Sequence, residues 1–303
     1  MNFLEPPVIN HEARLFWLAS YPKSGNTWTR SFIAALRSMN EEFIHENTFE
    51  ESFDIDLNDL RTGVIASGRE WIQNALGFSL DSLTPNEIDT LRPSAYRYIN
   101  SVTKNWGYHK AHDAYSFVGE GAARQPMFPR DVTRGALYIV RNPLDVCISF
   151  ANHSKCSIDE SIAKMNNSNC ALCKTEIGQA NQVRQRLRSW SGHVRSWQNA
   201  DLPVKIVRYE DMKSKPFETF FEIATFLELP NDKELIEKSL ELTRFERLQK
   251  KEREFGFREK PVGVQSFFRK GIVGDWKNTL STQQVDTIVK DHSEVMSNLG
   301  YLP

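Results

Sequence analysis

Residues 15–30, LFWLASYPKSGNTWTR, join an apolar run to a polar loop and then to a segment compatible with a helix. The apolar run at 15–19 is typical of a buried strand. The loop SYPKSGNT follows at residues 20–27, and helix-compatible residues begin at Trp28. Such a unit directs backbone N–H groups and the positive end of a helix dipole at one place, where Lys23 adds a cation. The stretch therefore predicts a binding site for a phosphate-like anion.

Other strands and helices alternate along the rest of the chain. Short aliphatic runs predict parallel strands at residues 136–140 and 204–208, with a weaker candidate around 108–110. Helical patterns cover residues 28–39, a segment opening at Asn142 and Pro143, a long apolar stripe from Val183 to Trp197, and residues 216–229 and 284–299. This order predicts an α/β fold, a three-layer sandwich with a central, mostly parallel sheet.

We find no clear linker, so one domain over residues 1–303 is expected. Within it, residues 40–100 are acidic and irregular and predict surface helices and a lid. Residues 150–180 form a Cys-bearing insertion, and residues 250–271 read as a long loop. Both the lid and the loop are suited to the rim of a site.

Composition limits the function classes. The formal net charge is −1, so a cationic site must come from a local concentration of Lys and Arg, and neither nucleic acid nor a membrane surface is an expected partner. No apolar run approaches the roughly 20 residues that cross a bilayer. The opening MNFLEPPVINHEAR lacks the basic and apolar regions of a signal peptide, so a cytoplasmic location is expected.

The four cysteines, Cys147, Cys156, Cys170 and Cys173, lie close together in the sequence. His153-x2-Cys156 and Cys170-x2-Cys173 have the ligand types and pair spacing of a structural zinc site. Because short Cys-x2-Cys matches often arise by chance, reduced thiols or one disulfide in a polar insertion are the favoured interpretation, and zinc is the alternative.

The loop at 20–27 differs from the nucleotide-triphosphate P-loop, which requires Gly-x4-Gly-Lys followed by Ser or Thr. Here Lys23 precedes Gly25, and no magnesium-binding partner is obvious. Pro22 presets the turn, and Gly25 allows the backbone to approach an anion closely. A diphosphate-like ligand held by lysine and backbone donors without a metal fits this loop better.

A second cationic motif is RNPLDVCIS, residues 141–149. Arg141 ends a predicted strand, where ligands of open α/β sheets bind, and Ser149 shares a helix face with the N-cap Asn142. A third is FRKGIVGDW, residues 268–276, with two adjacent cations beside a glycine. Each is weak alone, because capped helices and basic turns are common.

Together the three motifs resemble the signature set of the cytosolic, P-loop-like sulfotransferases that use 3′-phosphoadenosine 5′-phosphosulfate (PAPS). The 5′-phosphosulfate loop of that family, Tyr-Pro-Lys-Ser-Gly-x-Thr-Trp, matches residues 21–28. Its 3′-phosphate element matches residues 141–149, and its late Arg-Lys-Gly-x-x-Gly-Asp-Trp matches residues 269–276. The resemblance covers most of the chain and implies a P-loop NTPase-like fold, PAPS as cofactor, adenosine 3′,5′-bisphosphate (PAP) as product, and no required metal.

The resemblance also assigns cofactor-binding residues. Those expected at the 5′ end are Lys23, Ser24, Gly25, Asn26 and Thr27. Those expected at the 3′-phosphate are Arg141, Ser149, Arg269, Lys270 and Gly271. Those expected against the adenosine are Trp28, Tyr209 and Phe245.

For catalysis, Lys110-Ala111-His112 matches the family's Lys-x-His, whose histidine is the base. A neutral imidazole, with an ordinary pKa near 6.5, suits proton removal from an acceptor hydroxyl. We expect His112 as general base, with Lys110 and Lys23 stabilising the leaving side. His109 receives little weight. The implied acceptor is a hydroxyl or amine of a small or glycosylated molecule, with residues 40–100 on the acceptor side.

Three departures and two alternatives remain. The Cys-bearing segment at 150–180 has no counterpart in the family. Asn26 stands where vertebrate members usually carry Thr. The family's dimer motif is present only in part, as Lys277-x3-Ser281-Thr282-x3-Asp286, which leaves the oligomeric state open. A P-loop nucleotide kinase or NTPase is the first alternative, because Glu210 and Asp211 follow a predicted strand and could hold magnesium. A noncatalytic nucleotide-binding scaffold is the second.

Overall fold

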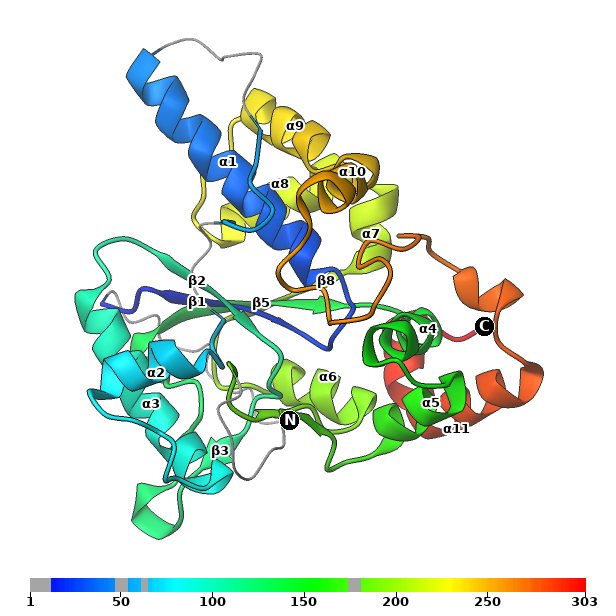
Figure 1. Ribbon diagram of the computed structural model, residues 1–303, viewed down its shortest axis with the longest axis horizontal. Coiled ribbons are helices and arrows are strands. Elements are labelled where there is room, and N and C mark those ends of the chain that lie inside the picture. Colours follow the sequence, from blue (N-terminus) through cyan, green and yellow to red (C-terminus); the bar gives the residue numbers. More distant parts are fainter. Residues whose placement is uncertain (1–11, 47–53, 61–64, 174–180) are drawn as a thin grey trace, which may run out of the picture. The chain divides into compact units, whose positions relative to one another are not determined.

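The structure, a computed structural model, describes residues 12–46, 54–60, 65–173 and 181–303 (Figure 1). Two compact units interleave along the chain. The first comprises residues 1–21, 63–138 and 167–206, and the second comprises residues 22–62, 139–166 and 207–303. Whether the chain acts as the single domain expected from its sequence stays a prediction.

A four-stranded sheet has the strand order β2-β1-β5-β8. Its strands are β1 (Leu15–Ser20), β2 (Gly107–Ala111), β5 (Thr133–Val140) and β8 (Val204–Arg208). β1 and β2 run parallel, with Leu15 opposite Gly107 and Ala19 opposite Ala111. Every residue of β1 is buried, as is usual for strands of a parallel sheet covered by helices. The predicted α/β fold with a central parallel sheet is confirmed.

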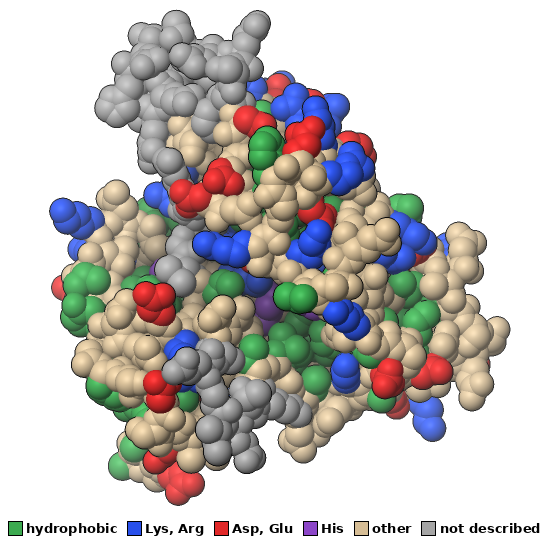
Figure 2. Space-filling view, in the orientation of Figure 1, with side chains coloured by type: hydrophobic (Ala, Val, Ile, Leu, Met, Phe, Trp, Pro, Cys, Tyr) green, Lys and Arg blue, Asp and Glu red, His purple; other side chains and the backbone are tan. Residues whose placement is uncertain are grey.

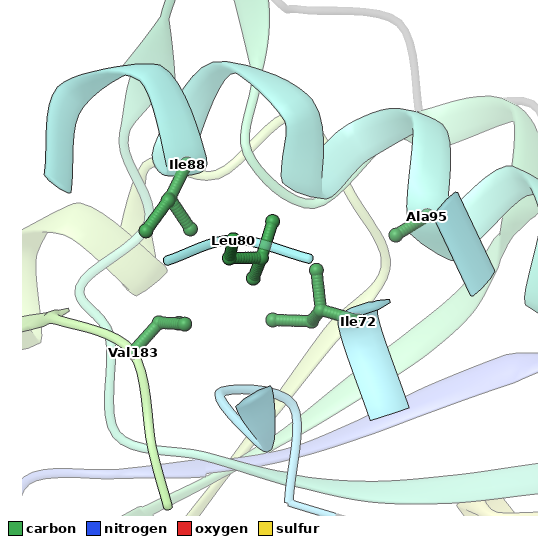
Figure 3. Close-up of a cluster of buried hydrophobic side chains, with 5 residues drawn as sticks. All are labelled: Ile72, Leu80, Ile88, Ala95 and Val183. Atoms are coloured by element: carbon green, nitrogen blue, oxygen red, sulfur yellow. The ribbon is translucent and has the colours of Figure 1, made fainter. Parts of the chain in front are cut away.

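The first unit carries a helical pair beside the sheet strands. Its helices and short strands are α2 (Arg69–Leu76), α3 (Pro85–Val102), α6 (Trp190–Gln198), the pair β3 (Phe117–Val118) and β4 (Gln125–Pro126), and the pair β6 (Ala171–Leu172) and β7 (Gln185–Arg186), with 3-10 turns at Gly121–Ala123 and Arg130–Val132. α2 packs against α3 through a cluster of buried side chains, which Figure 3 shows: Ile72, Leu80, Ile88, Ala95 and Val183.

The second unit is mostly helical. Its helices are α1 (Asn26–Glu46), α4 (Pro143–Ser154), α5 (Ile158–Asn166), α7 (Tyr209–Ser214), α8 (Pro216–Phe226), α9 (Lys233–Leu242), α10 (Phe245–Phe255), the 3-10 turn η3 (Asp275–Asn278) and α11 (Thr282–Asn298). α9 packs against α1 and α8, while α4 packs against α5 and α11. Basic and acidic side chains are interspersed on the visible face (Figure 2), and ion pairs such as Glu234 with Lys238 join successive turns.

The long apolar stripe predicted from Val183 to Trp197 is only partly helical. α6 begins at Trp190, where Ser189 caps the helix by accepting a hydrogen bond from the Gly192 N–H. Residues before the cap run in extended β7, and Arg188 has a φ of 59°, which breaks any continuous helix. Val183 instead joins the buried cluster between α2 and α3. The prediction of one continuous helix, which came from apolar residues spaced three and four apart, was therefore wrong for residues 183–189.

The structure describes only part of the segments predicted to form the rim of the site. α2 and α3 lie in the 40–100 segment, while residues 47–53 and 61–64 fall outside the described residues. The Cys-bearing segment at 150–180 contains α5 and β6, and residues 174–180 are outside the described part. The loop predicted from residue 250 begins later, because α10 continues to Phe255. No helix within the described ranges is both long and apolar enough to cross a membrane.

Candidate functional site

The loop that precedes α1 has the strained, close-packed geometry of an anion cradle. Lys23 and Gly25 adopt positive φ angles of 71° and 110°. The Gly25 backbone passes directly over Tyr209, since a Cβ at residue 25 would lie 2.8 Å from the Tyr209 Cδ2 atom. α1 begins at Asn26, so the first N–H groups of a long helix open from this loop. Lys23 Nζ lies 3.6 Å from the centroid of the Phe267 ring.

Several buried polar atoms here have no hydrogen-bond partner among the described residues, and two of them bear on an anion. They are Ser24 Oγ, on a side chain with no exposed surface, and Arg141 Nε, on a residue 8% exposed. Buried donors without acceptors are costly, and native proteins rarely leave them so. An anionic ligand between these groups would supply the missing acceptors, so the residues present fit the phosphate groups that the sequence predicts.

Arg141 connects three motifs that lie far apart in the sequence. It follows β5 directly, and its Nη1 donates to the Lys23 carbonyl oxygen at 3.3 Å. Its Nη2 donates to the Ile272 carbonyl oxygen at 2.9 Å, and its guanidinium carbon lies 4.4 Å from the centroid of the Tyr209 ring. The loop at 21–27, the start of α4 and the late Gly-containing loop therefore meet around one guanidinium within the second unit.

The start of α4 holds the late loop through Asp145. Asn142 caps α4 as predicted, its Oδ1 accepting the Leu144 N–H at 3.0 Å. The Asp145 carboxylate accepts the N–H groups of Gly274 and Trp276, at 2.7 and 3.0 Å. Asp145 lies in the first turn of α4, where a carboxylate suits the helix dipole. Nothing in the sequence near Asp145 indicates that its carboxylate binds the backbone of residues 274–276.

Arg269 and Lys270 share one carboxylate. Arg269 Nη2 lies 3.2 Å from Asp275 Oδ2, and Lys270 Nζ lies 2.7 Å from Asp275 Oδ1. Burial alone would raise the pKa of Asp275, but the hydrogen bond and charge of Lys270, with Arg269, outweigh it and lower that pKa. Asp275 therefore stays ionised and holds both cations in place beside Gly271.

Aromatic rings gather next to this loop. The Tyr209 hydroxyl donates to the Gly271 carbonyl oxygen at 3.2 Å, and the Gly271 backbone lies so close to Phe245 that a Cβ would be 2.5 Å from the ring. Trp28 packs edge-on against Tyr209, with ring centroids 6.1 Å apart. Lys213 Nζ, which sequence reasoning missed, lies 5.6 Å from the Trp28 ring centroid. The three aromatic residues expected to contact adenosine thus lie in one unit with the cationic residues.

Ser149 lies on α4, half-buried, one helical turn beyond Asp145. Thr27 and Asn26 lie in the first turn of α1 and are buried. Their assignment to the cofactor stays a prediction, as does that of the other cofactor-binding candidates.

Two of the catalytic candidates, His112 and Lys110, belong to the first unit, whereas Lys23 belongs to the second. Lys110 lies on β2 opposite Leu18 and is half-buried. His112 follows β2, and its Nδ1 lies 2.8 Å from the Ser20 carbonyl oxygen. Because a carbonyl only accepts, Nδ1 must carry the proton, and Nε2 is then the basic nitrogen of the neutral ring. The structure thus gives His112 the tautomer that a base acting through Nε2 needs.

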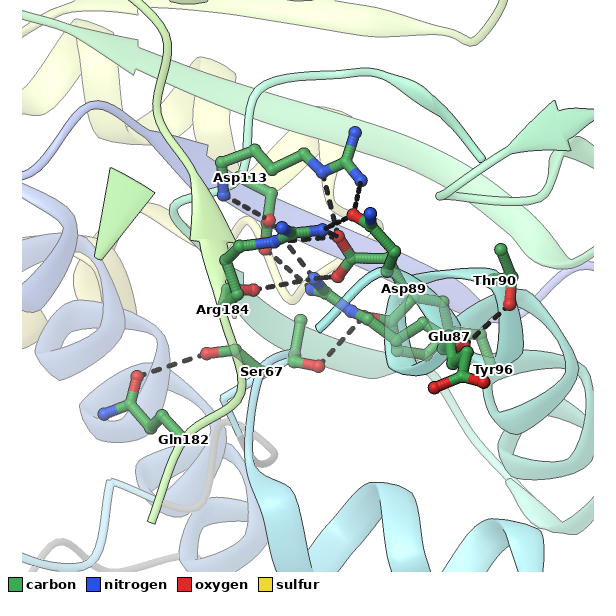
Figure 4. Close-up of polar contacts among 12 residues, drawn as sticks. Ser67, Glu87, Asp89, Thr90, Tyr96, Asp113, Gln182 and Arg184 are labelled. Carbon is green, nitrogen blue, oxygen red and sulfur yellow. Dashed lines mark hydrogen bonds and ion pairs between the residues drawn. The ribbon is translucent and has the colours of Figure 1, made fainter. Parts of the chain in front are cut away.

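Asp113, the neighbour of His112, anchors a buried polar network (Figure 4). Its carboxylate accepts from Arg92 Nη1 and Nη2, at 3.2 and 2.6 Å, and both side chains are fully buried. It also accepts the Arg186 N–H at 2.8 Å. Asp89, on α3, pairs with Arg184 and Arg186 in the same network. This network fixes the chain just beyond the candidate base.

His109 has a packing role instead. It is 5% exposed, and its ring lies against Trp17 and Trp71, with centroids 5.8 and 4.7 Å away. A side chain enclosed by two indole rings is poorly placed to reach a substrate, which agrees with the little weight it received.

The zinc alternative finds no support among the described residues. Within the described ranges, no group of three or more His, Cys, Asp or Glu side chains could hold a metal ion, and all four cysteines are free thiols. The proposed ligands have separate surroundings: His153 packs edge-on against Phe267, and Cys156 Sγ accepts from Lys164 Nζ at 3.4 Å. A disulfide is also absent from these four residues.

The magnesium-holding role considered for Glu210 has no support. One of its carboxylate oxygens accepts the Asn142 N–H at 3.0 Å, and the other accepts the Tyr301 hydroxyl at 2.6 Å. Burial, then the neighbouring Glu210 charge, raise the pKa of Tyr301, so the phenol remains a donor. Glu210 therefore supports the start of α4 beside Arg141.

Comparison with known proteins identifies the relatives of this chain. A family model described as "Sulfotransferase domain" matches residues 127–300, more than half of the chain. Sulfotransferase 1B1 of Mus musculus is 33% identical over 112 residues, which cover 34% of this chain and 37% of that protein. Cytosolic sulfotransferase 7 of Arabidopsis thaliana is 24% identical over 290 residues, covering 91% of this chain and 78% of that protein. The match thus spans little more than a third of the mouse relative and over three quarters of the plant one.

Solved structures share the fold. Mouse sulfotransferase SULT7A1 complexed with PAP superposes with a TM-score of 0.56 at 19% identity, covering 96% of this chain and 86% of that one. Retinol dehydratase in complex with androsterone and inactive cofactor PAP superposes with a TM-score of 0.59 at 16% identity, covering 94% and 81%. At these identities the likeness concerns the arrangement of helices and strands.

Proposed function

This chain belongs to the sulfotransferase domain family, and we propose that it transfers the sulfuryl group of PAPS to a hydroxyl or amine of a small or glycosylated acceptor. The observation that carries the proposal is the convergence on Arg141 of the Lys23 loop and the Ile272 loop. Two cationic segments then serve one ligand with two anionic ends. The PAP present in the mouse SULT7A1 structure, and the plant relative named a cytosolic sulfotransferase, support PAPS as donor and the cytoplasm as location.

When bound, PAPS supplies an electrophilic sulfuryl group and PAP as leaving group. Lys23, Ser24 and the N–H groups at the start of α1 would hold the 5′ end of PAPS, where donors and a cation can stabilise negative charge. Arg141, Arg269 and Lys270 hold the 3′-phosphate at the start of α4. Trp28, Tyr209 and Phe245 enclose the adenosine, because their rings gather beside Gly271. In-line positioning then supplies much of the rate.

His112 removes the proton of the acceptor at Nε2. The Ser20 carbonyl oxygen holds Nδ1–H, orients the ring and stabilises the imidazolium that forms. Lys110, two residues earlier on β2, contributes positive charge on the leaving side. A nucleotide kinase is less favoured than a transferase, because the Glu210 carboxylate that would hold magnesium already accepts hydrogen bonds from Asn142 and Tyr301.

Labelled sulfate transfer from PAPS onto a panel of phenols, alcohols, sterols, glycosides and amines tests the activity directly. We expect turnover that EDTA does not reduce and PAP binding by calorimetry without magnesium. His112→Ala should lower kcat at least 10²-fold while retaining the Kd for PAP. His109→Phe is the matched control, because a ring there still packs against Trp17 and Trp71, and it should retain turnover.

Two outcomes would contradict the proposal. Unchanged turnover in His112→Ala would assign the reaction to other residues. Magnesium-dependent ATP binding with no affinity for PAP would instead support the nucleotide kinase or NTPase alternative.

A further inference from the structure

We propose that His193 is a positioning residue for His112, holding the base through its backbone; this rests on the proposed function, in which His112 removes the acceptor proton. His193 lies on α6, far from His112 in the sequence and in no motif that the sequence analysis used. Its Nε2 lies 3.0 Å from the His112 carbonyl oxygen. Both residues belong to the first unit.

One face of α6 binds three backbone groups in a row. His193, Ser196 and Trp197 are spaced to lie on the same side of a helix. They contact, respectively, the His112 carbonyl, the Tyr115 N–H at 3.0 Å and the Asp113 carbonyl at 3.1 Å. Hydrogen bonds therefore join residues 112–115, which include the base, to α6. His193 makes the one nearest to the His112 imidazole.

The protonation of His193 follows from its neighbours. The His112 carbonyl only accepts, so Nε2 carries a proton, and Nδ1 accepts from the Tyr138 hydroxyl at 2.9 Å. Burial raises the pKa of Tyr138, which keeps that hydroxyl a donor. Burial also lowers the pKa of His193 to about 4, so the ring is neutral at neutral pH and makes both bonds.

His193 also packs on the residue next to the other anchor of the base. The Tyr21 ring meets His193 edge-on, with centroids 5.5 Å apart, and Tyr21 directly follows Ser20, whose carbonyl holds His112 Nδ1. One buried ring thus supports both the main chain of His112 and the strand end that orients its side chain. A displacement of a base by about 1 Å can lower a rate on the order of 10²-fold.

The test compares His193→Leu with His193→Gln. Leu removes both hydrogen bonds, whereas Gln retains an amide N–H near the Nε2 position. We expect His193→Leu to lower kcat about 10- to 100-fold with the Kd for PAP within about twofold, and His193→Gln to recover most of that loss. Val194→Ala, a buried neighbour on α6, is the control for lost packing and should retain kcat. If His193→Leu does not fold, His193→Asn, whose amide falls short of the carbonyl, replaces it.

A double-mutant cycle with His112→Ala decides whether His193 acts through the base. In the His112→Ala background, His193→Leu should change kcat by less than about twofold. Equal effects in both backgrounds, or a kcat within about twofold of wild type in His193→Leu, would overturn the inference. Failure of the proposed function is distinct, because the wild type itself would then show no PAPS-dependent turnover. Nitrogen-15 spectra of His112, which should lose the Nδ1–H tautomer signature in His193→Leu, give a readout independent of activity.

Discussion

Arg141 donates a hydrogen bond to the backbone carbonyl of Lys23, across 118 positions of sequence and a distance of 3.3 Å. A second bond from Arg141 reaches the Ile272 carbonyl. The guanidinium thus fixes the spacing between the two cationic loops before any ligand arrives. Under the proposed function, this spacing sets the distance between the anionic ends of the ligand.

Arg141→Ala should therefore weaken PAP much more than adenosine 5′-monophosphate, which lacks the 3′-phosphate. A lost charge-assisted contact of about 1.5–3 kcal/mol corresponds to a roughly 10- to 150-fold weaker Kd for PAP. Lys23→Ala should weaken both nucleotides, because its cation serves the 5′ end. Calorimetric titration of both variants with both nucleotides measures the difference. Equal losses for the two nucleotides in Arg141→Ala would contradict the two-ended arrangement.

Gly25→Ala should weaken PAP binding more than the same substitution at another glycine with a positive φ. Residue 25 has a φ of 110°, and a Cβ would come within 2.8 Å of Tyr209 Cδ2. Gly77→Ala is the matched control, since Gly77 also has a positive φ, of 78°, but a Cβ there meets nothing within 4 Å. We expect a loss of about 1–2 kcal/mol of stability from the strained backbone in both variants. Only Gly25→Ala should also weaken PAP at least tenfold, as measured by calorimetry.

The buried Arg92–Asp113 pair should be far more sensitive than an exposed pair of similar geometry. Arg92→Met leaves the Asp113 carboxylate buried without its cation, which costs about 3–5 kcal/mol. Arg97→Met breaks the Arg97–Asp131 pair, whose side chains are 40% and 51% exposed, and should cost below about 1 kcal/mol. Urea unfolding of both variants measures the free energies. Similar costs would show that the network in Figure 4 does not depend on its central pair.

Acid should destabilise the protein through His193. Its pKa is lowered from 6.5 to about 4 in the folded chain by burial, so the unfolded chain binds more protons in that window. Stability is therefore retained above pH 6.5 and falls as pH drops toward 4, by about 3 kcal/mol from this group. The groups facing the ring are Tyr138, Tyr21 and Arg188, and burial raises the pKa of both phenols, so they stay neutral over this range.

His193→Gln removes this titration. The difference in unfolding free energy between wild type and variant, measured in urea at pH 7.5, 5.5 and 4.5, should shift in favour of the variant as pH falls. A difference that stays constant with pH would assign the acid sensitivity to other groups.

Local motifs made much of the site predictable. Three parts of the site are each formed by one short stretch of sequence: β1, the loop at 21–27 and the capped start of α4. Strand length, turn residues and an N-cap could therefore be recognised directly. The aliphatic runs at 136–140 and 204–208 likewise predicted β5 and β8. These elements could be predicted because each depends on neighbours within a few residues, whereas the roles assigned to the site residues stay predictions.

The contacts that support the site could not be predicted, because they join residues far apart in the sequence. Asp145 reaches residues 274–276, and His193 reaches His112, only through tertiary packing. The apolar spacing from Val183 to Trp197 looked helical throughout, although the helix begins only at Trp190, after the Ser189 cap and the positive φ of Arg188. Nothing in a short window distinguishes a residue that supports a distant loop from one that fills a core.

Asp275 has a consequence for how ligand binding should respond to ionic strength. Under the proposed function, the 3′-phosphate would meet two cations, Arg269 and Lys270, whose charge the Asp275 carboxylate already partly compensates. Fewer mobile counterions are then displaced on association than the number of basic side chains suggests. The affinity of this loop for a phosphate should therefore fall less steeply with ionic strength than two uncompensated cations would predict.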